Sequence, residues 1–172
     1  MIKQIKRISF QHTGNHMIDK ADIRPILKNI PWLMDLSQDQ ITKLEMISGF
    51  RFLEEGEILF KEGDNDNLLF IVSEGQLGIE IFVPGHGQVR LYNAEPLDLI
   101  GWDSMTPVAR HRITTIIALK NSNLIYINGS ALVELCEKDK ELGYVIMRRV
   151  SNVIATRMLD MRIKLIDLFM KK

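Results

Sequence analysis

Residues 99–118 read LIGWDSMTPVARHRITTIIA, which is the pattern of a strand, a glycine, a short turn, a loop and a second strand. Gly101 has no Cβ, so the backbone there can come close to a ligand. The N–H groups of the turn that follows have no partner within the turn and can bind an anion. Arg112, which leads into the second strand, can add a bidentate contact to phosphate or carboxylate. The stretch predicts an anion clamp, and the alternative is a bulge glycine beside a surface arginine.

Short strands are expected on both sides of this stretch. Residues 68–72 form a continuous apolar run, residues 76–83 alternate, and PGHG at 84–87 is typical of a hairpin loop. Closely spaced strands of this kind favour a sandwich or a barrel-like roll. We expect strands at 52–53, 57–61, 68–72, 76–83, 88–92, 97–100, 113–119 and 123–127.

Helical patterns flank the strands. Residues 21–29 are predicted to form a helix, and SQDQ at 37–40 fits a capping box that begins another. Residues 131–137 and 140–170 are predicted to form a short helix and a long, proline-free one. The chain is therefore expected to be α+β. We expect three parts: an N-terminal arm (1–20), helices and strands (21–130), and C-terminal helices that dimerise (131–172).

Composition narrows the function. The 172 residues carry 22 basic and 22 acidic side chains, and zero net charge argues against a domain that binds nucleic acid by bulk charge. Cys136 is the only cysteine, which excludes a disulfide framework and indicates a reducing compartment. The chain shows neither a signal peptide nor an apolar run of the ~20 residues that a membrane span needs. We expect a cytoplasmic protein without membrane contacts.

The sequence carries no recognisable catalytic or metal-binding pattern. The four histidines have no paired metal spacing, and no Ser/His/Asp order, paired carboxylates or phosphate-binding loop can be identified. We therefore expect no metal site, and we expect the protein not to be an enzyme.

Three segments carry a resemblance to a known family. Residues 71–78, IVSEGQLG, resemble the strand–turn–strand hallmark of the cyclic nucleotide-binding domain, with Gly75 and Gly78 at its small positions. IPWLMDLS at 30–37 and GEILFKEGD at 56–64 are similar to that family's leading segment and to its first hairpin. The resemblance, which spans about residues 26–170, is to the catabolite activator-like members. It implies an eight-stranded antiparallel β-roll (jelly-roll-like, a double-stranded β-helix) that holds its ligand inside.

The opening stretch then resembles the family's phosphate-binding cassette. The resemblance implies that Arg112 holds a cyclic phosphate. In the family a glutamate holds the ribose 2′-hydroxyl and a serine or threonine follows the arginine, but Trp102 and Ile113 occupy these two places. The cassette positions are Gly101, Trp102, Ser104, Met105, Arg112, Ile113 and Thr114.

The departures from the family pattern allow more than one interpretation. Trp102 either plugs an emptied pocket or stacks on a planar ligand. Asp103, shifted by one position from the lost glutamate, is expected to face elsewhere. Thr114 is a candidate to replace the lost hydroxyl, because on a strand it shares a face with Arg112.

The long helix is predicted to form a homodimer. Apolar residues recur every seven positions, with an alternate set between them. The predicted seam consists of Met147, Ile154, Met158, Met161, Leu165 and Leu168. Leu142, Val145, Ile146, Val150 and Val153 are expected to cover the roll. In the alternative, both stripes pack within one chain.

These observations give three hypotheses. The first is a stand-alone regulatory module that senses a cyclic or other nucleotide, or another small anionic ligand, through a degenerate cassette. The second is an interaction module that has lost its ligand, and the third is a signal-dependent transcriptional regulator that acts through a partner. Well-known bacterial relatives continue into a DNA-reading helix-turn-helix, whereas this sequence ends with the long helix, so direct DNA binding is not expected.

Overall fold

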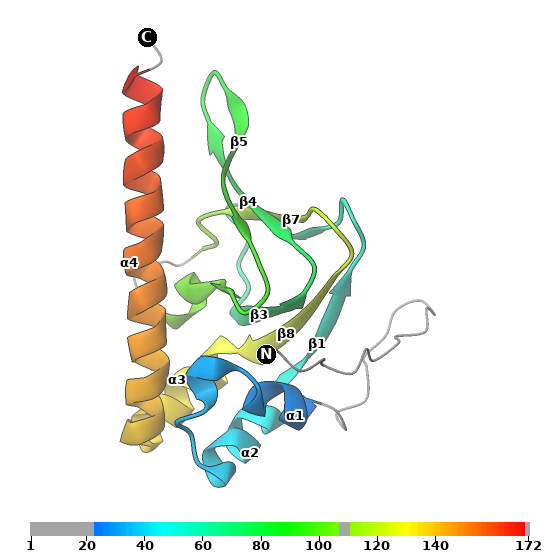
Figure 1. Cartoon of the computed structure of the whole chain (residues 1–172), viewed down its shortest axis with the longest axis vertical. Coiled ribbons are helices and arrows are strands. Elements are labelled where there is room, and N and C mark those ends of the chain that lie inside the picture. The colour runs from blue at the N-terminus through cyan, green and yellow to red at the C-terminus, as the bar shows by residue number, and fades with distance from the viewer. Residues whose placement is uncertain (1–22, 107–110, 171–172) are drawn as a thin grey trace, which may run out of the picture.

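The computed structural model describes residues 23–106 and 111–170. Two four-stranded antiparallel sheets face each other as a roll, short helices gather at one end, and a long helix runs along the side (Figure 1). The predicted α+β class and the eight-stranded antiparallel roll are confirmed. The arm predicted at residues 1–20 lies outside the described residues.

Each sheet is built from strands that are distant in sequence. The first sheet has the order β1-β8-β3-β6 and the second the order β2-β7-β4-β5. Their bounds are β1 Ser48–Leu53, β2 Ile58–Phe60, β3 Leu68–Glu74, β4 Leu77–Val83, β5 Gly87–Ala94, β6 Leu99–Ile100, β7 Thr115–Ala118 and β8 Ser122–Asn128. The first strand begins earlier than predicted, because Ser48 and its neighbours pair with the end of β8.

The helices follow the predicted order. They are α1 Ile23–Lys28, α2 Gln38–Met46, α3 Gly129–Lys138 and α4 Lys140–Met170, with 3₁₀ turns η2 Pro31–Leu33 and η3 Trp102–Met105. The predicted capping box is confirmed: Gln40 N donates to Ser37 Oγ at 3.3 Å, and Ser37 N donates to Gln40 Oε1 at 2.9 Å. None of the described helices is long and apolar enough to cross a membrane.

Strand β3 separates two hydrophobic cores. Because side chains alternate along a strand, Leu69 and Ile71 face the helices while Phe70 and Val72 face the inside of the roll. We call the first set the helix-side core, which includes Leu33, Leu44, Leu99, Met105, Ile125, Ile127 and Leu132. The second set is the roll core, which includes Leu53, Phe60, Leu77, Ile79, Ile100, Ile116 and Leu124.

Helix α4 spans the height of the molecule and packs against the roll and the N-terminal helices (Figure 1). Most of the residues predicted to face inward are buried in the helix-side core: Leu142, Ile146, Val150 and Val153. Further along α4, the Arg157 guanidinium stacks over the Tyr92 ring of β5, with Cζ 3.9 Å from the ring centroid. The helix is therefore joined to the structure at its start by apolar packing and near its middle by a cation–π contact.

The buried start of α4 generates a stability prediction. Leu142→Ala should lower the free energy of unfolding by about 2–5 kcal/mol, because it removes a fully buried side chain from the helix-side core. Lys140→Ala, at an exposed position two residues earlier, should change it by less than about 0.5 kcal/mol. Urea denaturation measures both. Equal effects of the two substitutions would contradict the assignment of the core.

Candidate functional site

Arg112 lies at the centre of the cassette region, between η3 and β7. Its backbone is held by the loop after β2: Arg112 N donates to Asp64 O at 2.8 Å, and Gly63 N donates to Arg112 O at 2.8 Å. Only 1% of its side chain is exposed. The arginine is therefore inside the protein, not on its surface as the alternative interpretation of the sequence proposed.

Every N–H of the Arg112 guanidinium is used inside the chain. Nε donates to Asp66 at 2.9 Å, and Nη2 donates to the other Asp66 oxygen and to Leu68 O. Nη1 donates to Asp103 Oδ1 at 2.5 Å and to Gly101 O at 3.2 Å. A guanidinium has five N–H donors, and these five bonds occupy them all.

Two carboxylates thus surround one cation. Burial acts to raise the pKa of Asp66, but the hydrogen bond from Arg112, the Leu68 N–H and the arginine charge outweigh it and hold that pKa below its ordinary value. Burial likewise acts to lower the pKa of Arg112, but the hydrogen bonds to Asp66 and Asp103 and the charges of these two carboxylates outweigh it, so the pKa is raised. One arginine and two aspartates give the cluster a formal charge of −1.

Asp103 corrects one expectation. It was predicted to face elsewhere, yet it is 4% exposed and points at Arg112. In addition to the bond from Arg112, its carboxylate accepts hydrogen bonds from Ser104 N at 3.0 Å and from Ile113 N at 3.2 Å. The reason is the tight η3 turn, which folds residue 103 back toward the arginine in a way that linear spacing along the sequence does not reveal.

Gly101 allows this arrangement. Its φ of 72° lies in the left-handed region, which L side chains rarely adopt. A Cβ at this position would lie 2.8 Å from Arg112 Nη1 and 2.8 Å from Leu68 O. The predicted close approach therefore exists, but the approaching group is Arg112 of the same chain.

The other cassette residues point in different directions. Ser104 Oγ donates to Gly101 O at 2.8 Å, within its own turn. Met105 is buried in the helix-side core and Trp102 is half-buried against it. Ile113 is 43% exposed, and Thr114 is half-buried just before β7. The structure gathers Gly101, Ser104 and Arg112 in one place and turns Trp102 and Met105 toward the helices.

The inside of the roll is filled by aromatic and aliphatic side chains. The Phe60 ring lies against the Arg112 guanidinium, whose Cζ is 4.1 Å from the ring centroid. Phe60 also pairs with Phe70 at a distance of 6.1 Å between the ring centroids. Tyr92 packs against the same roll core on the side of α4, and burial raises its pKa to about 12. This is the region where the resemblance implied a ligand.

Two contributors were missed by the sequence analysis, Asp66 and Phe60. Asp66 belongs to the polar run DNDN at 64–67, whose composition is typical of a turn. An acidic residue just before a buried strand was the available signal, although its partner, 46 residues away, could not be identified from spacing.

The two glycines of the roll turn have different roles. Gly75 lies between β3 and β4 with φ 94°, and a Cβ there would come within 2.2 Å of Ser122 Oγ. Gly78 lies inside β4, where a Cβ would meet the Arg90 side chain at 2.8 Å. Gly75 therefore keeps the turn close to the start of β8.

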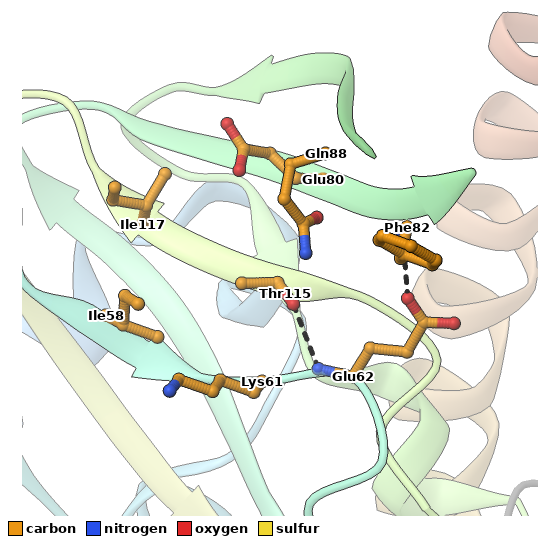
Figure 2. Close-up of a pocket in the computed structure, with 8 residues that line it drawn as sticks. All are labelled: Ile58, Lys61, Glu62, Glu80, Phe82, Gln88, Thr115 and Ile117. Carbon is orange, nitrogen blue, oxygen red and sulfur yellow. Dashed lines mark hydrogen bonds between the residues drawn. The ribbon is translucent and has the colours of Figure 1, made fainter. Parts of the chain in front are cut away.

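A hollow of about 520 Å³ lies on the second sheet (Figure 2). Because Ile116 and Ile79 face the roll core, the neighbouring Thr115 and Ile117 face outward, so this hollow is on the outside of the roll. Its polar groups are partly engaged: Glu62 N donates to Thr115 Oγ1 at 3.0 Å, and Glu62 accepts Phe82 N at 3.0 Å. The lining residues are Ile58, Lys61, Glu62, Glu80, Phe82, Gln88, Thr115 and Ile117.

No group of three or more histidine, cysteine, aspartate or glutamate side chains that could hold a metal ion occurs in the part of the chain that the structure describes.

Comparison with protein families gives one match. The family described as "Cyclic nucleotide-binding domain" matches residues 50–139. A search of curated proteins finds no significant match.

Several solved structures share the fold. A putative cyclic nucleotide-binding protein from Geobacter metallireducens is 24% identical, with a TM-score of 0.65 over 83% of this chain and 99% of that one. A cyclic nucleotide-binding domain from Methylobacillus flagellatus is 18% identical, with a TM-score of 0.69 over 77% and 74%. The sensor domain of a Pseudomonas aeruginosa transcriptional regulator is 16% identical, with a TM-score of 0.66 over 79% and 93%.

The close approach at Gly101 generates a second prediction. Gly101→Ala should destabilise the protein by more than the roughly 1–2 kcal/mol that a left-handed L residue costs, because its Cβ would also meet Arg112 and Leu68 O. Gly56 is the matched control, since it has φ 85° and open space around its Cβ position. The melting temperature of Gly101→Ala should be clearly lower than that of Gly56→Ala, and the reverse order would contradict the described packing.

The lowered pKa of Asp66 generates a prediction of acid sensitivity. A carboxylate whose pKa is lowered by folding stabilises the protein at pH values above its pKa in the unfolded chain, near 3.8. That contribution is lost as the pH falls through the lower pKa of the folded state. Asp66→Asn should therefore be less stable than the wild type at pH 7, and its stability should depend less on pH below about 4. Urea titrations between pH 7 and 3 measure this, and parallel pH profiles would show the prediction to be wrong.

Proposed function

Because this chain belongs to the cyclic nucleotide-binding domain family, we propose that it is a regulatory module that acts through its long C-terminal helix as a homodimer and does not take cyclic AMP or cyclic GMP in its roll. The observation that carries the proposal is the internal engagement of Arg112. All five of its donors bind groups of the same chain, and 1% of its side chain is exposed.

A cyclic nucleotide would have to displace these contacts. A hydrogen bond to a charged group is worth about 1.5–3 kcal/mol, so exchanging Asp103 or Asp66 for a phosphate oxygen gains little. The ligand would also approach a cluster with a formal charge of −1. Trp102 supplies a donor but no acceptor for the ribose hydroxyl, and it packs toward the helices.

The packing of the roll core argues in the same direction. Phe60 and Phe70 occupy the space beside Arg112, and Tyr92 under Arg157 occupies the side toward α4. A roll core filled with buried side chains does not admit a nucleotide unless those side chains move. Of the three hypotheses from the sequence, these contacts favour the interaction module over the small-ligand sensor.

Exposed apolar residues on α4 support the dimer. Most of the predicted seam is exposed: Met147 at 42%, Met158 at 73%, Met161 at 46% and Leu165 at 55%. Ile154 is half-buried against the helix-side core, and the Leu168 side chain lies outside what the structure describes. A monomer rarely leaves such a contiguous apolar surface in water.

The second half of α4 is apolar beyond the seam. A further set of exposed side chains recurs there at spacings of three and four residues: Leu159, Ile163, Ile166 and Met170. A helix of this length with two exposed apolar stripes is expected to be covered when the protein acts, and a second copy of α4 covers the seam through heptad packing.

Calorimetric titration tests the proposal for the roll. Cyclic AMP and cyclic GMP should bind the wild type with a Kd weaker than about 1 mM, which corresponds to −4.1 kcal/mol. Low-micromolar binding of either nucleotide by the wild-type protein would refute this part and restore the small-ligand sensor. A catabolite activator-type protein titrated under the same conditions is the positive control.

Light scattering tests the dimer. The wild type should have the mass of two chains at micromolar concentration, and Met161→Glu should shift it to a monomer by placing a charge in the seam. Thr156→Glu is the matched control, because it adds a charge at an exposed position of the same helix that does not flank the predicted seam in the heptad, and it should leave the mass unchanged. A wild-type monomer, or a dimer unaffected by Met161→Glu, would contradict the proposal.

A further inference from the structure

We propose that the carboxylate of Asp103 is a built-in ligand of this roll: it occupies the anion site formed by the Arg112 guanidinium and the N–H groups of Ser104 and Ile113, so that the site is closed by the chain itself. This goes beyond the proposed function, since it identifies what fills the site and predicts that removing one side chain opens it to a small carboxylate.

The donors that converge on Asp103 are those expected around a bound oxyanion. Oδ1 accepts from Arg112 Nη1 at 2.5 Å and from Ser104 N at 3.0 Å, while Oδ2 accepts from Ile113 N at 3.2 Å. One guanidinium and two backbone N–H groups, from two different segments of the chain, thus bind one carboxylate. Charge-assisted bonds of this kind are the strong ones.

Burial separates Asp103 from the other carboxylate of the cluster. The Asp103 side chain is 5% exposed, whereas that of Asp66 is 36% exposed. Asp66 approaches Arg112 from the loop before β3 and contacts Nε and Nη2, on a different edge of the guanidinium. Asp66 therefore neutralises the arginine from the outside, and Asp103 occupies the inner position.

The geometry also specifies the ligand that would replace Asp103. Truncation to alanine removes one carboxylate group and one formal charge, which leaves Arg112 and Asp66 as a neutral pair facing a small polar space. A monovalent carboxylate no larger than formate restores the charge of −1 and the lost acceptors. A nucleotide remains too large, because Phe60 lies against the guanidinium.

The experiment is a chemical rescue. Asp103→Ala should be less stable than the wild type, and sodium formate should raise its melting temperature relative to sodium chloride at equal ionic strength. A rise of roughly 3–6 °C is expected at a formate concentration tenfold above its Kd. The wild type should show no difference between the two salts. If Asp103→Ala does not fold in chloride, the yield of folded protein in formate replaces the melting temperature as the measurement.

Two further variants make the test specific. Asp103→Asn fills the same space without the charge, so formate should not rescue it. Asp66→Ala removes the outer carboxylate and leaves Asp103 in place, so formate should have a clearly smaller effect there than on Asp103→Ala. Equal rescue of Asp66→Ala, equal rescue of Asp103→Asn, or no rescue of Asp103→Ala in either measurement would overturn the proposal. None of these results depends on the oligomeric state or on cyclic nucleotide titrations of the wild type.

Discussion

The buried guanidinium of Arg112 is the constraint on which the middle of this structure depends. A charge removed from water must be paired, and each N–H left without an acceptor costs free energy. The chain meets this demand with two carboxylates and two carbonyl groups from two separate segments, residues 66–68 and residues 101–103. Loop, strand and turn are therefore held in one arrangement by a single side chain, and Gly101 is required because no Cβ fits beside it.

In the proposed function, the same demand makes this roll differ from a ligand-gated one. In a roll whose arginine lacks internal partners, an external anion would complete the site, and order would depend on the ligand. Here the anion is part of the chain, and Phe60 and Tyr92 pack the space beside it. Helix α4 meets the roll through Arg157 and the helix-side core. In the proposed function the roll is a stable platform for α4, and the exposed half of α4 is the regulatory surface.

Periodicity along the sequence predicted closely spaced strands flanked by helices, and the resemblance to a known family implied that the strands form an eight-stranded roll. Alternation and turn glycines located the eight strands, although the bounds of β1 were misjudged because Ser48 and Gly49 join a strand only through pairing with β8. The Ser37–Gln40 cap and the inward face of α4 are local patterns, and both are found as predicted. Local patterns of this kind depend on helix and strand geometry alone, which the order of residues specifies.

The sequence by itself determined that Gly101, Ser104 and Arg112 lie within one stretch of twelve residues, from which a shared site was predicted. It could not determine what the arginine binds. Asp66 reaches Arg112 across 46 positions, and Asp103 does so only because a left-handed glycine and a 3₁₀ turn reverse the chain. Which acceptors surround a buried cation depends on how distant segments pack, and only the tertiary structure decided that they belong to the chain itself.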